Sequence, residues 1–330
     1  RGLVEAEEAS ILLRLAPLET KHATEVLYRR VHGLSSSTVD TSAVRKHIDT
    51  RLNTSEARSL EEIVTGGDDR PCCLGGIPLV LQQAGAHIAR TGNFSDYRKQ
   101  LSDGAQQSPS HLDDISKLRL VWKMNIQTLC PAARRVLKIV AQFSEVQVSD
   151  QLLQIVVEVD AQDNGTAMDP LPFSLDHALD HAVVKQLVDA AVLLRVVNKD
   201  GADTYYMQRI ARDFAQDLSI DADDHDPIDP LRLAFKALIR DADRFGGCHK
   251  TWYWRSSEDN KGALELLPHV ASALEKYDGV ADLVDMAIDL TGFCAGLAMH
   301  TSAFLKAKAF AEQSLRYAQD RRNSNPGRVP

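Results

Sequence analysis

The stretch "LGGIPLVLQQAGAHI", residues 74–88, places two glycines, a branched residue and a proline directly before a helix-forming run. Pro78 has a φ angle that is preset for the first helical position, and Gly75–Gly76 let the backbone bend just ahead of it. Apolar side chains then recur at helical spacing as far as Ile88. The stretch therefore predicts a helix that starts at Leu79 after a tight bend.

The composition limits the classes of function. A chain of 330 residues is long enough for about two or three domains with a sizeable core. Its formal net charge of −8 argues against nucleic acid as the partner, because gripping a phosphate backbone requires concentrated Lys and Arg. No apolar run approaches the roughly 20 residues that span a bilayer. We expect a protein that binds neither nucleic acid nor membrane.

The cysteines are odd in number and scattered, and none forms a C-x-x-C pair. This distribution fits neither a disulfide scaffold nor a zinc module, and it favours a reducing, cytoplasmic location. The five are Cys72, Cys73, Cys130, Cys248 and Cys294.

The N-terminal part begins without Met or a signal peptide, so we expect a fragment whose missing motifs lie upstream. Residues 11–18, "ILLRLAPL", predict a short strand that ends at Pro17. The following "ETKHATEVLYRRVHG" predicts an amphipathic helix closed by Gly33. Residues 102–114, "SDGAQQSPSHLDD", have the composition of a polar linker.

The middle of the chain predicts a compact module. One helix precedes Pro131 and a second follows it, a third lies near Gln151–Val157, and a longer one spans 177–195. Two β-prone runs on either side of Asp200–Gly201 give a strong hairpin signal. Helices followed by a hairpin describe a winged helix.

The C-terminal part follows an acidic connector at 216–230 and is helical throughout. "GALELLPHVASALEKY" and "ADLVDMAIDLTGFCAGLAMHTSAFLKAKAF" predict paired antiparallel helices with small residues at the crossings. Gly292 and Ala307 are the candidates for those small positions, although their spacing leaves the register open. A lone helical pair cannot bury both of its faces, so we expect further repeats to follow.

The order of these parts resembles the NB-ARC class of STAND signalling ATPases with tetratricopeptide repeats. "LGGIPL" resembles the GLPL segment of that family through Gly76, Ile77, Pro78 and Leu79. "LVWKMNIQTLCPAARRVLKIVAQF" is similar to the opening of its winged helix, "TYYMQRIARDF" occupies the place of its Met-His-Asp motif, and "LLPHV" resembles the start of its repeats. Other residues that carry the likeness are Leu18, Ala23, Leu27, Trp122, Leu129, Ala133, Leu137 and Phe143.

The resemblance implies a mainly α fold with a helical lid domain, a winged helix with a small β-hairpin, and α-helical hairpin repeats. Residues 1–16 would be the tail of a nucleotide-binding α/β domain, and 17–114 the helical domain with the GLPL segment. The winged helix would span 115–222, and 223–330 would hold a helical linker and the start of the tetratricopeptide-like repeats.

The resemblance also implies a nucleotide site for ADP or ATP. Adenine would pack against the ring of Pro78, while neighbouring backbone groups satisfy its polar edge. Met207 and Gln208 would hold the ADP-bound state, with Gln208 in place of the family's histidine. Its amide can still donate a hydrogen bond but has no titratable charge. The alternative for Gly76–Leu79 is simple packing in a core.

No catalytic residue or metal ligand is assigned. The stretch "GGCHKTW", 246–252, has His249 where a phosphate-binding loop requires glycine, and no other such loop exists in the sequence. Phosphates and Mg²⁺ would then depend on an upstream half, so this chain should not hydrolyse ATP alone, and whether an intact protein is an ATPase stays open. His177 and His181 have a spacing that can bind zinc, but without an evident third ligand they are read as solvated.

Two other functions remain as alternatives. One is a non-catalytic tetratricopeptide-type interaction scaffold with a vestigial nucleotide site, which the departure at Gln208 and the insertion before Cys72 favour. The less favoured one is a winged-helix DNA-binding regulator, which the acidic residues of the helix at 177–195 oppose. In the main interpretation the partners are nucleotide and other proteins, bound through the C-terminal helices, and a homo-oligomer forms on activation.

Overall fold

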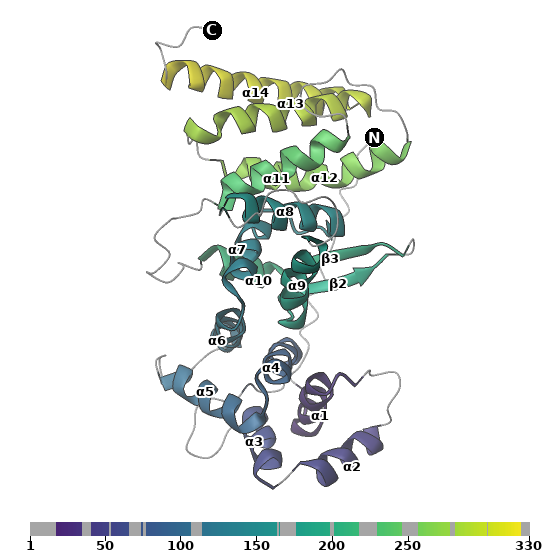
Figure 1. Cartoon of the computed structure of the whole chain (residues 1–330), viewed down its shortest axis with the longest axis vertical. Helices are drawn as coiled ribbons and strands as arrows, with labels where there is room; N and C mark the ends of the chain where they lie inside the picture. Colours follow the sequence, from purple (N-terminus) through teal and green to yellow (C-terminus); the bar gives the residue numbers. More distant parts are fainter. Residues whose placement is uncertain are drawn as a thin grey trace, which may run out of the picture. The chain divides into compact units, whose positions relative to one another are not determined.

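The structure is a computed structural model, and it is mainly helical with one small sheet, as expected (Figure 1). The chain divides into two compact units, residues 1–125 and 126–330, which are described separately. The residues that the structure describes are 18–34, 41–52, 54–65, 74, 77–106, 114–163, 165, 176–198, 201–217, 230–245, 257–277, 281–301 and 303–324.

The first unit is a bundle of helices. They are α1 (Thr20–Val31), α2 (Thr41–Arg51), α3 (Thr54–Thr65), α4 (Pro78–Thr91), α5 (Phe94–Gln106) and α6 (Asp114–Gln127). The largest fully buried side chains of this bundle include Tyr28, Tyr97 and Trp122. The division between the units falls in the last turn of α6, whereas the sequence placed this helix at the start of the winged helix.

Glycines determine the close contacts and ends of these helices. Gly33 has φ +62° just after α1, where the sequence predicted the helix to close. A Cβ at Gly85 would lie 2.6 Å from Cγ of Arg30, so α4 approaches α1 more closely than any other residue type would allow. The predicted linker at 102–114 is wrong at its start, because α5 continues to Gln106. Gly104 there lies under Leu120 of α6, and this packing favours the last helical turn.

The second unit starts with three helices and a three-stranded antiparallel sheet. The helices are α7 (Pro131–Val140), α8 (Asp150–Asp163) and α9 (Asp176–Asp189), and the strands are β1 (Val148–Ser149), β2 (Leu193–Val197) and β3 (Asp203–Met207). Their order in the sheet is β1-β3-β2, with Leu193 opposite Met207 and Val148 opposite Tyr205. This arrangement is that of a winged helix, and the predicted hairpin is present.

The predicted helix at 177–195 is too long. It ends at Asp189, because Ala191 takes a positive φ of 54° and the chain then enters β2. The backbone groups of Leu193–Arg195 pair with β3, so they cannot continue the helical ladder. The stretch 177–195, which resembled one continuous helix, therefore includes the start of strand β2.

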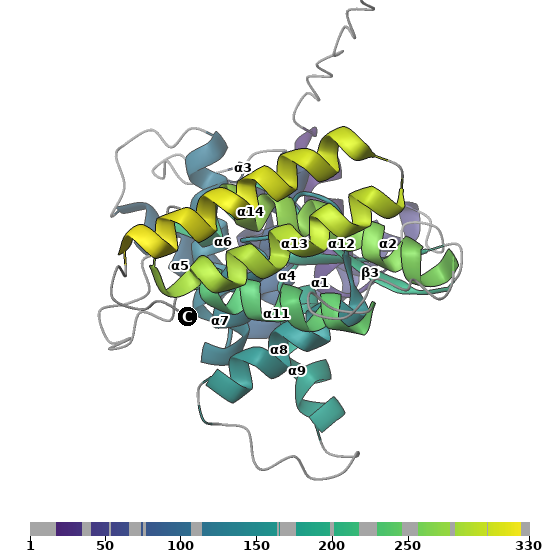
Figure 2. The same cartoon turned by 90° about the horizontal axis from the view of Figure 1, so that it is seen from above.

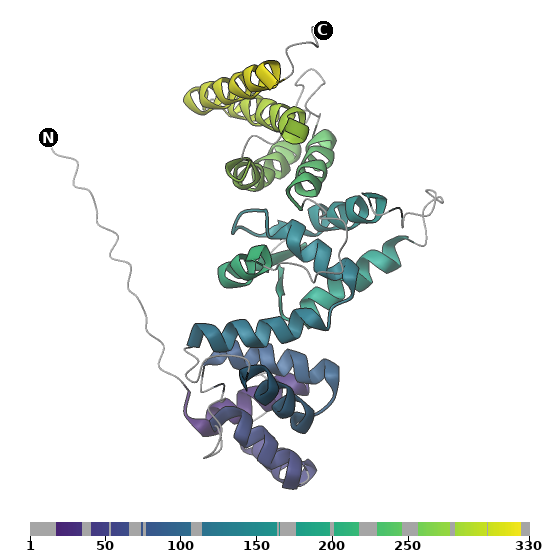
Figure 3. The ribbon, with the colours of Figure 1, turned by 90° about the vertical axis from the view of Figure 1, so that its left-hand side faces the viewer.

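The rest of the second unit is helical: α10 (Arg209–Asp217), α11 (Pro230–Arg244), α12 (Ser257–Glu275), a short 3₁₀ turn (Ala281–Leu283), α13 (Val284–His300) and α14 (Phe304–Ser324). Helix α11 packs against α8, α12 and α13, and α13 packs along α14 (Figures 2 and 3). No described helix is long and apolar enough to cross a bilayer.

The helical pair α13–α14 forms as expected, but one of its small residues has a different role. Among the described residues, apart from its own helix backbone and chain neighbours, nothing lies within 4 Å of a Cβ built at Gly292, so this glycine is not needed for a close crossing there. Ala307 of α14 is buried, which agrees with a small position. Of the two candidates, Ala307 is therefore the one that behaves as a small packing position.

Candidate functional site

The predicted adenine-side residues lie at the start of α4 in the first unit. Ile77 is extended and precedes the helix, and Pro78 is its first residue, one position earlier than predicted. No side chain caps this helix start. Pro78 is exposed, Ile77 and Leu79 are partly exposed, and burial begins at Val80. The ring of Pro78 therefore lies on the surface of this unit; Gly76 falls outside the described residues.

The predicted latch residues lie in the second unit, at the end of β3. Met207 is buried opposite Leu193 of β2. Gln208 directly precedes α10, and its carbonyl oxygen accepts a hydrogen bond from the backbone N–H of Arg212 at 3.0 Å. Its side-chain Oε1 is buried, and within the described part of the chain it has no hydrogen-bond partner.

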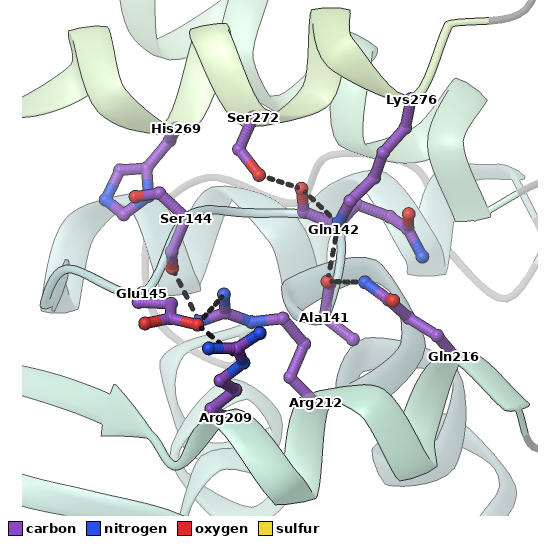
Figure 4. Close-up of polar contacts among 10 residues, drawn as sticks. All are labelled: Ala141, Gln142, Ser144, Glu145, Arg209, Arg212, Gln216, His269, Ser272 and Lys276. Carbon is purple, nitrogen blue, oxygen red and sulfur yellow. Dashed lines mark hydrogen bonds and ion pairs between the residues drawn. The ribbon is translucent and has the colours of Figure 1, made fainter.

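A polar cluster of the second unit joins the end of α7 to α10 and α12 (Figure 4). We call it the α7–α12 joint. The last carbonyls of a helix have no partner within it, so they need donors from elsewhere. The joint comprises Ala141, Gln142, Ser144, Glu145, Gln147, Arg209, Arg212, Gln216, His269, Ser272 and Lys276.

Three side chains supply donors to the end of α7. Nζ of Lys276 lies 2.9 Å from the carbonyl oxygen of Ala141 and 3.0 Å from that of Gln142. Nε2 of Gln216 donates to the same Ala141 oxygen at 2.6 Å. The hydroxyl of Ser272 donates to Gln142 at 3.3 Å. Helices α10 and α12 therefore hold the same helix end.

His269 of α12 makes two hydrogen bonds whose direction follows from its partners. Nε2 lies 3.2 Å from the carbonyl oxygen of Gln147, which can only accept, so Nε2 carries the proton. Nδ1 then accepts from the hydroxyl of Ser144 at 3.0 Å. The side chain is 2 % exposed and packs beside Phe143. Burial lowers the pKa of His269 to about 4, so the ring is neutral at pH 7.

Two cations approach the same region. Nη2 of Arg212 donates to the carbonyl oxygen of Ser144 at 2.9 Å, and Nη1 lies 3.7 Å from Glu145. Burial, together with the nearby charge of Arg212, lowers the pKa of Lys276 to about 8. The negative end of the helix dipole of α7 favours both cations and opposes this cost. The cost of burying the charges of Arg212 and Lys276 is therefore offset by the negative end of α7.

A pocket lies beside the joint, with a volume of about 740 Å³. We call it the wing pocket, because it lies between the β-sheet of the winged helix and helices α11 and α12. Glu145, Gln147 and His269 belong both to its lining and to the joint. A molecule bound there would contact the groups that hold α12 against the end of α7.

Other sequence predictions have different outcomes. The stretch 246–252 lies outside the described residues, as do the side chains of His177 and His181. Among the described residues no group of three metal-ligating side chains comes together. The sequence did not reveal the joint; its only trace was "LLPHV", which contains His269 and resembled the start of the repeats.

Comparison with protein-family models finds no match, and the curated proteins contain no match either.

Proposed function

We propose that this chain is the regulatory half of an ADP/ATP-dependent signalling switch of the STAND type. In this proposal Pro78 provides an adenine-side contact, and Met207 and Gln208 form a latch for the ADP state. The C-terminal helices contact other proteins. The observation that carries the proposal is the α7–α12 joint, because a switch must couple the module that holds nucleotide to the module that meets a partner.

The strength of the joint supports this coupling. Five hydrogen bonds connect α12 to the end of α7 and the segment that follows it. A hydrogen bond contributes about 0.5–1.5 kcal/mol net, and more when one partner is charged. The contacts together amount to several kcal/mol, well above thermal energy. The winged helix and α12 should therefore move as one body.

The start of α4 supports the nucleotide contact. Pro78 presents an apolar ring at the surface, on a helix start without a side-chain cap. Backbone N–H groups at such a start are available to a ligand. Phosphates and Mg²⁺ would be bound by protein outside this chain.

The test compares two prolines that each begin a helix. Pro78 and Pro131 both occupy the first helical position, and both are exposed. Replacing either by Ala costs up to about 1 kcal/mol of stability, because the unfolded chain gains freedom. Only Pro78→Ala should also weaken ADP binding to the intact protein, by about 1–2 kcal/mol or roughly 5- to 30-fold. Isothermal titration calorimetry with ADP measures this difference. Absence of ADP binding, or equal affinities for the two variants, would refute the proposal.

A second candidate is an interaction scaffold with a vestigial nucleotide site. The observation that favours it is Gln208, which replaces the family's histidine and whose side-chain Oε1 is buried without a hydrogen-bond partner among the described residues. This candidate predicts no ADP binding by the intact protein, with protein partners still bound through the C-terminal helices. The DNA-binding alternative loses support, because Lys185 and Arg195 are paired with Asp189 and Asp203.

A further inference from the structure

The wing pocket has the size and walls of a ligand site. Its volume of about 740 Å³ falls within the roughly 300–1,000 Å³ typical of small-molecule sites. Tyr206 of β3 lines one side, and Phe245, which follows α11, lines another. A Cβ at Gly262 of α12 would lie 2.6 Å from the ring of Phe245. Glycine at this position therefore lets the aromatic ring pack directly onto α12 and form a flat wall.

The charge of the lining is negative. Among the described lining residues three are acidic, Glu145, Asp241 and Glu265, and one is basic, Arg244. His269 adds no charge, because burial keeps its pKa at about 4. A cation in this pocket would gain Coulomb energy, and an anion would lose it.

The three carboxylates differ in how closely a positive side chain pairs with each of them. Asp241 is 5 % exposed, and Nη1 of Arg244 lies 3.0 Å from its Oδ1. Glu145 has only long contacts, 3.6 Å to Arg209 and 3.7 Å to Arg212. Glu265 is exposed and, among the described residues, makes no ion pair. Glu265 is therefore the carboxylate best able to meet an incoming cation.

The wall of the pocket already holds one organic cation of the chain itself. The guanidinium of Arg244 bonds to Asp241, and its Cζ lies 5.8 Å from the centre of the Phe245 ring. A cation near a carboxylate and an aromatic face is favoured by both. Leu152 and Leu266 add apolar surface to the lining.

We propose that the wing pocket binds a small organic cation with an aromatic or apolar body, with its ammonium group facing Glu265. The apolar body would lie against Phe245 and Leu266. This inference does not rest on nucleotide binding, because the pocket shares no residue with the proposed adenine contact or with Met207 and Gln208. Its ligand would, however, touch His269 and so reach the α7–α12 joint.

The test uses three probes that share one aromatic body and differ in charge. They are tyramine, which is cationic, tyrosol, which is neutral, and 4-hydroxyphenylacetate, which is anionic. Binding to the whole chain is followed by saturation-transfer NMR and by the melting temperature, which rises with ligand concentration. We expect tyramine to bind most tightly and the anion least. Equal binding of all three, tighter binding of the anion, or no binding would overturn the proposal.

Two variants locate the site. Glu265→Gln and Glu275→Gln each remove one exposed carboxylate from α12, but only Glu265 lines the pocket. Because an exposed ion pair contributes about 0.2–1 kcal/mol, Glu265→Gln should weaken tyramine binding roughly 1.5- to 5-fold. Glu275→Gln should leave it unchanged. An equal effect of the two variants, or no effect of Glu265→Gln, would place the cation elsewhere and refute the site.

Discussion

Acidification should loosen the α7–α12 joint through His269. The neutral ring accepts from Ser144 and donates to Gln147, and it is shielded from water. Protonation would require Nδ1 to become a donor and would bury a charge near Arg212. The perturbation is therefore a change of pH, with His269→Gln as the variant that removes the titrating group but keeps a side-chain donor.

The magnitude follows from the pKa of His269, which burial lowers from 6.5 to about 4. The unfolded chain binds the proton more readily than the folded one between these values, so stability is highest above pH 6.5 and falls as the pH drops toward 4. Full titration corresponds to about 3 kcal/mol, and the loss by pH 5 is about 2 kcal/mol. Burial also lowers the pKa of His87 in the first unit, so a local measurement is needed.

Hydrogen–deuterium exchange of the α7 amides provides that measurement. After correction for the intrinsic effect of pH on exchange, protection in the wild type should fall about 30-fold between pH 7.5 and 5, since about 2 kcal/mol is lost. In His269→Gln it should change far less. His22→Gln, which alters an exposed histidine of the first unit, should behave as the wild type. If His269→Gln and the wild type lose protection equally, His269 does not control the joint.

Further perturbations test the helix contacts. Gly85→Ala should destabilise the first unit by about 1–3 kcal/mol in urea unfolding, because its Cβ would overlap Arg30; Gly292→Ala, with open space at Cβ, should instead be neutral or stabilising. Lys276→Met should remove two donors to the end of α7 and destabilise the second unit by about 1 kcal/mol at pH 7. Burial lowers the pKa of Lys276 from 10.5 to about 8, so above pH 8 the folded protein binds fewer protons than the unfolded chain and the wild type gains stability as the pH rises. The difference in the free energy of unfolding between the wild type and Lys276→Met, measured in urea, should therefore widen above pH 8. A difference that stays constant with pH would contradict this.

Local rules predicted the parts of the fold that depend on backbone geometry. Proline favours the first position of a helix, so the beginning of α4 at Pro78 was visible within one residue. The hairpin was visible because Gly201 takes a positive φ of 78° between two β-prone runs. Ala191 takes a positive φ although it is not glycine, and no sequence pattern predicts this conformation. The end of α9 was therefore misplaced.

The joint was hidden for a different reason. His269 and Ser272 of α12 and Lys276, which directly follows it, recur at helical spacing, and such a row of polar residues usually faces solvent. Their partners are the Ser144 hydroxyl and backbone carbonyls at the end of α7 and in the segment that follows it, which no periodicity in the sequence reveals. Only the folded chain brings these segments together, across more than 120 residues of sequence.

The joint gives the proposed latch a physical route to the C-terminal helices. Gln208 directly precedes α10, and Gln216 near the end of that helix donates to the carbonyl oxygen of Ala141. Lys276, which directly follows α12, donates to the same oxygen. A carbonyl has two lone pairs, so these two donors occupy its full capacity. A shift of α10 that moves Gln216 away would leave this oxygen to Lys276, so α10 and the end of α12 are coupled through one shared acceptor.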